Sequence, residues 1–299
     1  MANKIAYVFP GQGSQHPGMG LYLYQNSGAA KQLFHELEEQ LPGLMELCFH
    51  GDESKLKQTQ NTQPAIFAVS MAGVAVLEEK GIKAQALAGF SLGEVSALTC
   101  GGVFDLKTGF DLVQKRGDVM GAAAAEIPAS MVAVLKLSAN QVEDLAKGFE
   151  DVYPVNYNGP GQTVVAGSGE GFVKFQTAVK EQKGRVIPLQ VGGGFHSPFM
   201  KEASTSFANA LEDQSINDSI LPIYSNLTAN PYGQSEQEIK DTLAKQMISP
   251  VLWQKTMENM IATGVDTFIE VGPGKTLKGL IEKINKEVAV RSLEDFLTP

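Results

Sequence analysis

Cysteine is scarce in this sequence, with only Cys48 and Cys100 among 299 residues. Two cysteines are too few for a disulfide framework, and neither lies in a spacing typical of metal ligands. Long apolar runs are also missing, because the longest falls far short of the ~20 residues that a transmembrane helix needs. The first residues show no signal-peptide cleavage site and predict a strand. We therefore expect a cytoplasmic protein that does not span or bind a membrane.

Basic residues are outnumbered, with 24 Lys and Arg against 33 Asp and Glu and a formal net charge of −9. Sequence-independent binding of nucleic acid requires a basic face, so this balance argues against that function. The hydrophobic content of 43% is ordinary for a globular protein. The length suits one large domain, or one domain that carries a smaller one.

Strand-like and helical patterns alternate along most of the chain. In the first part we expect strands at 4–9 and 84–89, and helices at 27–41, 63–81, 92–100 and 105–121. The same alternation returns later, with elements expected at 199–213, 221–226, 236–247, 252–263, 266–271, 275–284 and 288–293. This alternation predicts an α/β core with a parallel sheet that is covered by helices on both faces.

The order of elements changes in the middle of the chain. Here we expect strands at 130–137, 152–157, 163–167 and 185–191, and helices at 138–149 and 170–184. The resulting order, β-α-β-β-α-β, is the split βαβ of ferredoxin-like folds, which can build a small sheet of its own. The sequence therefore predicts a core formed by 1–127 and 193–299, with an inserted ferredoxin-like subdomain at 128–192.

Three glycine-rich stretches resemble nucleotide-binding loops, and each lacks a required glycine. In "GQGSQH" and "GSGEGF" the third glycine of a dinucleotide fingerprint is replaced by His16 and Phe172. In "GPGKT" the first glycine of a phosphate loop is replaced by Ile269. Strand-end turns explain all three stretches better. We therefore expect no nucleotide hydrolase, no dehydrogenase, no cofactor and no metal.

The stretch "GFSLGEVSAL" places Ser91 between Gly89 and Gly93. A nucleophile elbow needs a strand, a sharp turn flanked by small residues, and a helix, and this stretch supplies all three. The serine would then stand at a helix N-terminus, where free N–H groups can stabilise an oxyanion. The pattern is equally compatible with a serine that only caps the helix.

A nucleophilic serine needs a base, and the chain has four histidines. His196 follows the last expected strand of the subdomain, in "GGGFHSPFM", and flexible loops at strand ends are where α/β sites are assembled. That position is also compatible with a purely structural histidine. The other three stand in a glycine-rich loop, on a polar helix surface and in an irregular segment: His16, His35 and His50. No orienting acid stands out, because three candidates are equally suited to helix caps or surface charges: Asp105, Asp111 and Asp118.

Eight short motifs occur together along the chain. They are "VFPGQGSQ", "TQPA", "GFSLGE", "KRG", "NYNGPGQ", "FHSPFM", "SPVLW" and "EVGPGK". Each is weak alone, but their order and spacing resemble those of malonyl-CoA:acyl carrier protein transacylases from about residue 4 to about residue 285. That family has an α/β-hydrolase-like core with an inserted ferredoxin-like subdomain, in agreement with the pattern read from the elements.

The resemblance implies roles for residues that the motifs match. Ser91 matches the nucleophile that carries the malonyl ester, and His196 matches its base. Gln12 and Leu92 match the residues whose backbone N–H groups form the oxyanion hole. Gln246 matches the residue that orients the histidine in place of an acid. This arrangement suits an acyl-enzyme that must survive until a thiol arrives.

The resemblance also implies an acyl pocket. Arg116 matches the arginine that binds the free carboxylate of malonyl, although its position alone is compatible with a surface cation. Gln63 and Asn158 match further residues near the acyl group. Phe90 replaces the histidine that usually precedes the nucleophile, which makes the site more apolar and bears on acyl selectivity. Phe195 favours malonyl, since malonyl-selective relatives often carry phenylalanine there.

The resemblance thus implies ping-pong transfer of malonyl from malonyl-CoA to the phosphopantetheine thiol of acyl carrier protein, with release of CoA, in fatty acid biosynthesis. A monomer is expected. Three alternatives stay open: an acyltransferase of a polyketide pathway, a serine esterase or thioesterase on the same fold, and an inactive scaffold subunit. The carrier protein is acidic in this family, and residues 275–291 hold five basic against two acidic residues, a net charge of +3. Lys183 and Arg185 offer a second basic patch.

Overall fold

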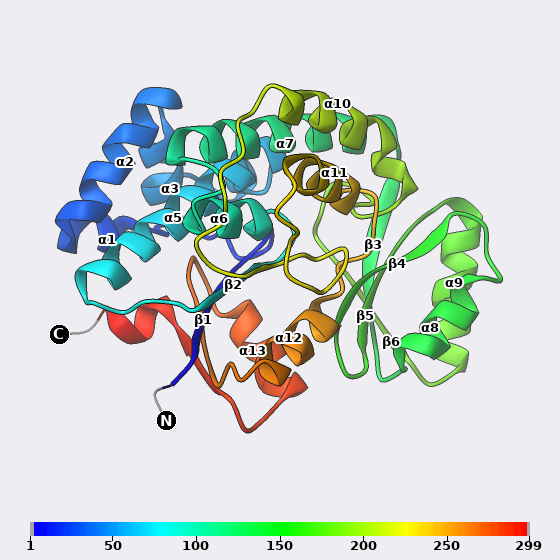
Figure 1. The fold of residues 1–299 in the computed structure, drawn as a ribbon. Helices are drawn as coiled ribbons and strands as arrows, with labels where there is room; N and C mark the ends of the chain where they lie inside the picture. The colour runs from blue at the N-terminus through cyan, green and yellow to red at the C-terminus, as the bar shows by residue number, and fades with distance from the viewer. Residues whose placement is uncertain (1–2, 298–299) are drawn as a thin grey trace.

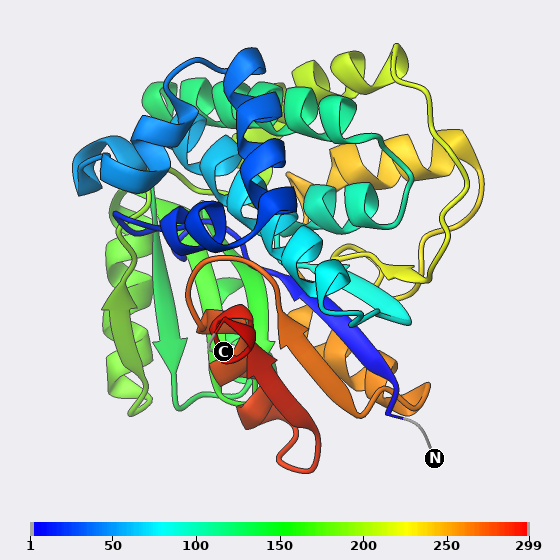
Figure 2. The ribbon, with the colours of Figure 1, turned by 90° about the vertical axis from the view of Figure 1, so that its left-hand side faces the viewer.

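Two separate β-sheets organise the chain in the computed structural model, which describes residues 3–297 (Figure 1). The larger sheet has the strand order β7-β2-β1-β8-β9, and all of its pairings are parallel. Figure 2 shows β1 in blue between β2 and β8. The strands are β1 (Ile5–Phe9), β2 (Ala86–Gly89), β7 (Ile223–Tyr224), β8 (Thr267–Glu270) and β9 (Ala289–Ser292). The predicted parallel sheet is confirmed.

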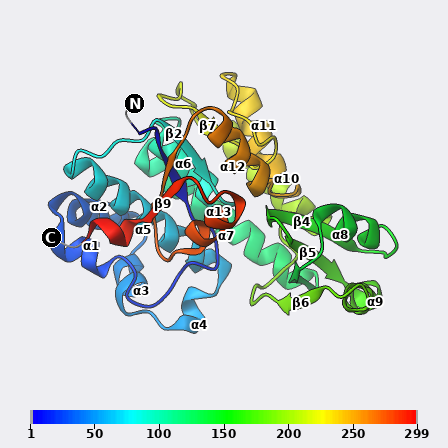
Figure 3. The same ribbon diagram turned by 90° about the horizontal axis from the view of Figure 1, so that it is seen from below.

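Helices cover both faces of this sheet, and the alternation of side chains along β1 shows why. Tyr7 and Phe9 belong to the hydrophobic cluster on the α5 side, whereas Ala6 and Val8 belong to the cluster beneath α12 and α13. Both faces of the strand are therefore apolar, as a fully covered parallel strand requires. Figure 3 places α5 and α12 on opposite sides of the strands. The covering helices are α5 (Thr59–Glu79), α6 (Gly93–Cys100), α7 (Leu106–Glu126), α12 (Trp253–Ala262) and α13 (Thr276–Ile284).

The smaller sheet has the order β4-β5-β3-β6 and is antiparallel throughout. Together with its two helices this is the ferredoxin-like arrangement that the sequence predicts. Val132 and Val134 pack under the helices, while Met131 and Ala133, which alternate with them, face the larger lobe. The elements are β3 (Ala129–Leu135), α8 (Ala139–Ala146), β4 (Val152–Gly159), β5 (Gln162–Ser168), α9 (Gly169–Glu181) and β6 (Arg185–Pro188).

The remaining helices surround α5 and α7. Three short ones escaped the sequence analysis, because so few residues show no helical period. The prediction that His50 lies in an irregular segment is wrong, since it is the last residue of α3. The remaining elements are α1 (Leu21–Asn26), α2 (Gly28–Gln40), α3 (Leu44–His50), α4 (Glu53–Leu56), η1 (Pro198–Met200), α10 (Lys201–Glu212), α11 (Glu236–Gln246) and η2 (Leu293–Phe296).

Several element ends differ from the prediction for local reasons. α5 begins at Thr59, four residues before the expected start, so Pro64 lies inside the helix. Proline is common at the first position of a helix, but a helix can also begin before it. α7 continues to Glu126 through a run of alanines, the best helix formers. β6 ends at Pro188, three residues before the expected end of the strand. Within residues 3–297, no helix is both long enough and apolar enough to cross a bilayer.

Candidate active site

The carboxyl ends of β1, β2 and β7 meet at one edge of the parallel sheet, where sites of α/β proteins form. Gln12 follows β1, Ser91 follows β2 and Asn226 follows β7. The backbone N–H of Ser91 donates to Asn226 Oδ1 at 2.7 Å, and Asn226 Nδ2 donates to the Gly89 carbonyl at 2.6 Å. The N–H of Phe90 also donates to the carbonyl of Phe9 in β1 at 2.9 Å, so three strands distant in sequence hold the loop that carries Ser91.

That loop has the geometry of a nucleophile elbow. Ser91 has φ 56°, a left-handed conformation that non-glycine residues seldom adopt. A Cβ on Gly89 would lie 1.9 Å from the carbonyl carbon of Gly93, and a Cβ on Gly93 would lie 2.2 Å from the Phe9 carbonyl oxygen. Both flanking positions therefore admit only glycine, for the steric reason that the sequence pattern indicates.

The hydroxyl of Ser91 lies 2.7 Å from Nε2 of His196, which is 3% exposed. On the other side of the ring, Nδ1 lies 2.9 Å from the backbone carbonyl of Gln246. A carbonyl oxygen only accepts, so Nδ1 carries the proton and Nε2 accepts from Ser91. Burial lowers the pKa of His196 from 6.5 to about 4, and the Arg116 cation acts in the same direction. The imidazole is therefore neutral near pH 7 and can accept a proton.

Arg116 stands on α7 and is 1% exposed, so it is not a surface cation. It donates from Nη1 to Gln63 Oε1 at 3.0 Å, and from Nη2 to Gln246 Oε1 at 2.9 Å and to Ser91 Oγ at 3.2 Å. Within residues 3–297 its Nε has no partner. Burial lowers the pKa of Arg116 to about 10, which still leaves it charged near pH 7. A buried cation with a free donor beside the serine hydroxyl suits an anionic ligand.

A cavity of about 80 Å³ opens at these groups, which is room for a small acyl group. The smaller sheet contributes Met131 to the wall of this cavity. Leu189 and Val191, which come after β6 in the same lobe, line it as well. Ten residues are expected at the site. Eight of them line this cavity: Gln12, Gln63, Phe90, Ser91, Leu92, Arg116, Phe195 and His196. Asn158 instead lines an adjoining cavity of about 210 Å³, which shares Asn156 and Phe90 with the first.

Two backbone N–H groups beside the cavity are free to stabilise an oxyanion. Leu92 directly precedes α6, and Gln12 lies in the turn after β1. In the described part of the chain neither N–H donates to a protein acceptor, whereas the neighbouring N–H of Gly93 donates to Phe90. Phe90 packs edge-on against Trp253 with 5.4 Å between ring centroids, so it presents an apolar surface to the serine.

The tenth expected residue, Gln246, has contacts that only the structure reveals. It holds the histidine through its main-chain carbonyl, while its side-chain Nε2 donates to the Ser91 carbonyl at 2.8 Å and to Glu94 at 2.9 Å. Sequence reasoning also missed Asn226, although a polar residue at the very end of the expected strand 221–226 was a usable signal. The other histidines and the candidate acids are exposed, and none of them lines the cavity: His16, His35, His50, Asp105, Asp111 and Asp118.

A serine on a strained elbow, in contact with a neutral imidazole, is the arrangement of enzymes that pass an acyl group through a serine ester. The parallel sheet and the strand-end position of the serine agree with that class. Within residues 3–297, no group of His, Cys, Asp and Glu has the arrangement of a metal site.

Comparison with known proteins narrows this class. The family model described as "Acyl transferase domain" matches residues 6–294. The malonyl CoA-acyl carrier protein transacylase of Bacillus subtilis (strain 168) is 38% identical over an alignment of 300 positions that covers 98% of this chain and 94% of that protein. The crystal structure of the enzyme of that name from Clostridium perfringens matches with a TM-score of 0.93 and 38% identity, covering 97% of this chain and 92% of that one.

A further match is a malonyl-transacylase in complex with its type II PKS acyl-carrier protein, with a TM-score of 0.90, 35% identity, and coverage of 97% of this chain and 95% of that one. The chain therefore belongs to the malonyl CoA-acyl carrier protein transacylase family of acyl transferases.

Proposed function

We propose that this protein transfers malonyl groups from malonyl-CoA to the phosphopantetheine thiol of acyl carrier protein. The observation that carries the proposal is the contact between Ser91 Oγ and His196 Nε2 at the elbow, beside the buried cation of Arg116. The family membership supports the substrate pair. The fatty acid pathway follows from the same relatives.

In the first half-reaction, His196 Nε2 takes the proton of Ser91 while Oγ bonds to the thioester carbonyl carbon. The backbone N–H groups of Gln12 and Leu92 hold the resulting oxyanion. The carbon–sulfur bond then breaks, and His196 returns its proton to the leaving CoA thiolate. The products are CoA and a malonyl ester on Ser91.

The second half-reaction runs the same steps on the carrier. His196 takes the proton of the phosphopantetheine thiol, whose sulfur attacks the ester carbonyl. The bond between Oγ and the acyl carbon breaks, and Ser91 receives the proton from His196. Gln246 keeps the ring oriented through its main-chain carbonyl at 2.9 Å, so no carboxylate is required for that purpose.

Selection of malonyl is assigned to Arg116. Its fork can pair with the free carboxylate of the acyl group in two parallel hydrogen bonds. An acetyl group would leave the guanidinium without a carboxylate to pair with directly, at a cost on the order of 2–5 kcal/mol. Gln63 orients the guanidinium, and Phe90 and Phe195 supply the apolar walls. Asn158 is assigned to the adjoining cavity rather than to the acyl group.

We further propose that residues 1–127 and 193–299 form the catalytic core and that 128–192 form an inserted subdomain. The two separate sheets and the separate hydrophobic cluster of the smaller one support this division. Because one chain supplies both Ser91 and His196, the site is complete in a monomer. The free thiols of Cys48 and Cys100 support the cytoplasm as its location.

Docking of an acidic carrier is assigned to the basic surface of α13. Lys275 pairs with Glu294 at 2.7 Å and Lys278 with Asp295 at 3.7 Å, so part of the local positive charge is balanced. Reversal of Lys278 and Lys283 to Glu should raise KM for carrier protein but not for malonyl-CoA. Equal effects on both KM values would exclude this face.

A polyketide carrier is the second candidate, because one structural relative is bound to a type II PKS carrier protein. The chemistry would be unchanged, and only the surface of the carrier would differ. Steady-state transfer to purified carriers of both kinds separates the two. A serine esterase is disfavoured, because a buried Arg116 beside the nucleophile would then have no use.

The decisive experiment is the intact mass of the protein after brief incubation with equal amounts of malonyl-CoA and acetyl-CoA and an acid quench. A malonyl adduct that is absent from Ser91→Ala is expected. An acetyl adduct would keep the nucleophile but contradict the assignment of Arg116. With no adduct, release of free malonate would indicate a hydrolase, and its absence would indicate a scaffold.

A further inference from the structure

Glu94 has no assigned part in the reaction, yet it lies fully buried on α6 directly behind the elbow. Three donors surround its carboxylate. Tyr232 donates its hydroxyl proton to Oε1, while the backbone N–H of Asn226 at 3.1 Å and Gln246 Nε2 at 2.9 Å donate to Oε2. Burial raises the pKa of Glu94, and the three donors, together with the Ser225 side chain, oppose that rise. Because Oε1 accepts from the Tyr232 hydroxyl and Oε2 accepts from two N–H groups, both oxygens act only as acceptors, which fits the ionised carboxylate.

The same donors also hold the nucleophile. Asn226 accepts the Ser91 N–H through Oδ1 at 2.7 Å, and Gln246 donates to the Ser91 carbonyl at 2.8 Å. The two peptide groups that flank the strained φ of Ser91 are therefore bound by residues that Glu94 binds in turn. Glu94 thus supports the elbow without touching the serine hydroxyl.

Gln246 also links Glu94 to Arg116. The cation donates to Gln246 Oε1 at 2.9 Å, and Gln246 Nε2 donates to Glu94 Oε2 at 2.9 Å. The amide dipole therefore points its oxygen at the cation and its hydrogens at the anion, an order in which neighbouring hydrogen bonds strengthen each other. Glu94 raises the pKa of Arg116 against the effect of burial. The resting site contains one buried cation and one buried anion.

We infer that Glu94 is a positioning residue that balances the charge of Arg116 through the Gln246 amide and so sets how strongly the site binds a carboxylated acyl group. The inference rests on the proposed function of Arg116. In the resting site the two charges cancel. A bound malonyl carboxylate adds a negative charge, which favours the imidazolium that His196 forms during acyl transfer. Without Glu94, Arg116 would bind the malonyl carboxylate more tightly. The occupied site would then be neutral overall instead of negative, so the imidazolium of His196 would be stabilised less.

Glu94→Gln removes the charge and can keep the contacts. The new carboxamide oxygen can accept from Asn226 and Gln246, and its NH₂ group can face Tyr232, whose hydroxyl can rotate to accept. In a Ser91→Ala background, we expect Kd for malonyl-CoA to fall by about three- to tenfold and Kd for acetyl-CoA to stay unchanged. With Ser91 present, acylation by malonyl-CoA should slow by a similar factor. Calorimetry and quenched-flow mass spectrometry measure the two effects.

Tighter binding with slower acylation is a signature that loss of structure does not produce. Weaker binding of malonyl-CoA, or equal losses with both acyl-CoAs, would overturn the inference and leave Glu94 a structural role. If wild-type protein acquires no malonyl group and Ser91→Ala does not bind malonyl-CoA, the proposed function itself fails. The two failures are therefore distinguishable.

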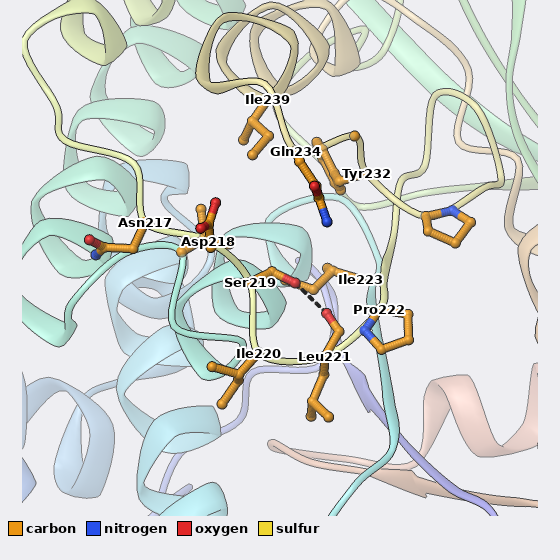
Figure 4. Close-up of a pocket in the computed structure, with 13 residues that line it drawn as sticks. Asn217, Asp218, Ser219, Ile220, Leu221, Pro222, Ile223, Tyr232, Gln234 and Ile239 are labelled. Carbon is orange, nitrogen blue, oxygen red and sulfur yellow. Dashed lines mark hydrogen bonds between the residues drawn. The ribbon is translucent and has the colours of Figure 1, made fainter.

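Tyr232 provides a test that leaves the charge in place. It lines a cavity of about 330 Å³ that shares no lining residue with the cavity at Ser91, and Figure 4 shows it there beside Gln234. Tyr232→Phe removes one donor but keeps the carboxylate. The ratio of Kd for malonyl-CoA to Kd for acetyl-CoA should therefore stay unchanged. Tyr7→Phe is the matched control, because Tyr7 is also buried and donates its hydroxyl proton to a backbone carbonyl. A changed ratio in Tyr232→Phe would contradict a role based on charge.

A double variant covers the case in which Glu94→Gln does not fold. Glu94→Gln combined with Arg116→Gln removes both charges, so it should unfold at a higher temperature than Glu94→Gln alone, which leaves the cation unbalanced. Recovery of folding in the double variant supports the charge pair. If the double variant unfolds no later, or also fails to fold, Glu94 does not balance Arg116 and the inference is wrong.

Discussion

Replacement of Arg116 by Met should convert a malonyl-selective site into one that no longer distinguishes malonyl from acetyl. Methionine fills much of the volume of the arginine stem and removes only the charged fork. The guanidinium is 1% exposed and lies 3.2 Å from Ser91 Oγ, so the carboxylate that it pairs with is also removed from water. Truncating one partner of such a pair costs about 2–5 kcal/mol, which corresponds to a loss of about thirtyfold to several thousandfold in malonyl transfer.

The acetyl reaction should respond differently. An acetyl group makes no use of the cation. Burial is the main cause of the low pKa of His196, and removal of Arg116 takes away the smaller contribution of its charge. Acetylation of Ser91 should therefore stay constant or increase. The assay is the rate of acyl-enzyme formation with each acyl-CoA, followed by quenched intact mass. Lys115→Met is the control, since Lys115 is an exposed cation on the same helix. Equal losses with both acyl groups, or an unchanged malonyl rate, would refute the reasoning.

Three further changes test the geometry of the site. Gln246→Ala keeps the main-chain carbonyl that holds His196 but removes the side chain that accepts from Arg116. The value of kcat/KM should therefore fall more for malonyl-CoA than for acetyl-CoA, and an equal fall would contradict this role. Because the pKa of His196 is lowered to about 4, its imidazole stays neutral in mild acid. The acylation rate should therefore stay level from about pH 8 to about pH 5 and decline only below that. A decline with a midpoint near 6.5 would show an unperturbed imidazole. Gly89→Ala should lower the free energy of unfolding by about 3 kcal/mol or more in denaturant titrations, because its Cβ would meet the Gly93 backbone at 1.9 Å; Gly28→Ala, with open space around it, is the neutral control.

Much of the fold follows from local patterns in the sequence. The alternation of strands and helices predicted the parallel sheet, and the β-α-β-β-α-β order predicted the second one. The elbow was also accessible, because the glycines on both sides of Ser91 are required by contacts within a few residues along the chain or with the adjacent strand. The short helices α1, α3 and α4 were missed, since six, seven and four residues are too few to display a period.

The site depends on contacts that the sequence pattern does not encode. Ser91 and His196 are 105 positions apart, and only the family resemblance paired them. Arg116 stands on a helix whose pattern is compatible with a surface position, and it is buried because α5 places Gln63 against it. The contact of His196 with a main-chain carbonyl carries no side-chain signature, so a search for an orienting acid could not find it. Glu94 and Asn226 acquire their roles only where β7 approaches β2.

The main-chain carbonyl behind His196 bears on which nucleophile can empty the acyl-enzyme. A carbonyl dipole stabilises an imidazolium less than a carboxylate would, and the ring is a weak base with a pKa of about 4. A thiol such as that of cysteine ionises near pH ~8.5, whereas water ionises near pH ~15.7. The pKa of the thiol therefore exceeds that of this imidazole by about four to five units, and the pKa of water exceeds it by more than about eleven, so proton transfer from water is much less favourable. The site can thus discriminate between carrier and solvent by the acidity of the nucleophile, even while water has access to the ester.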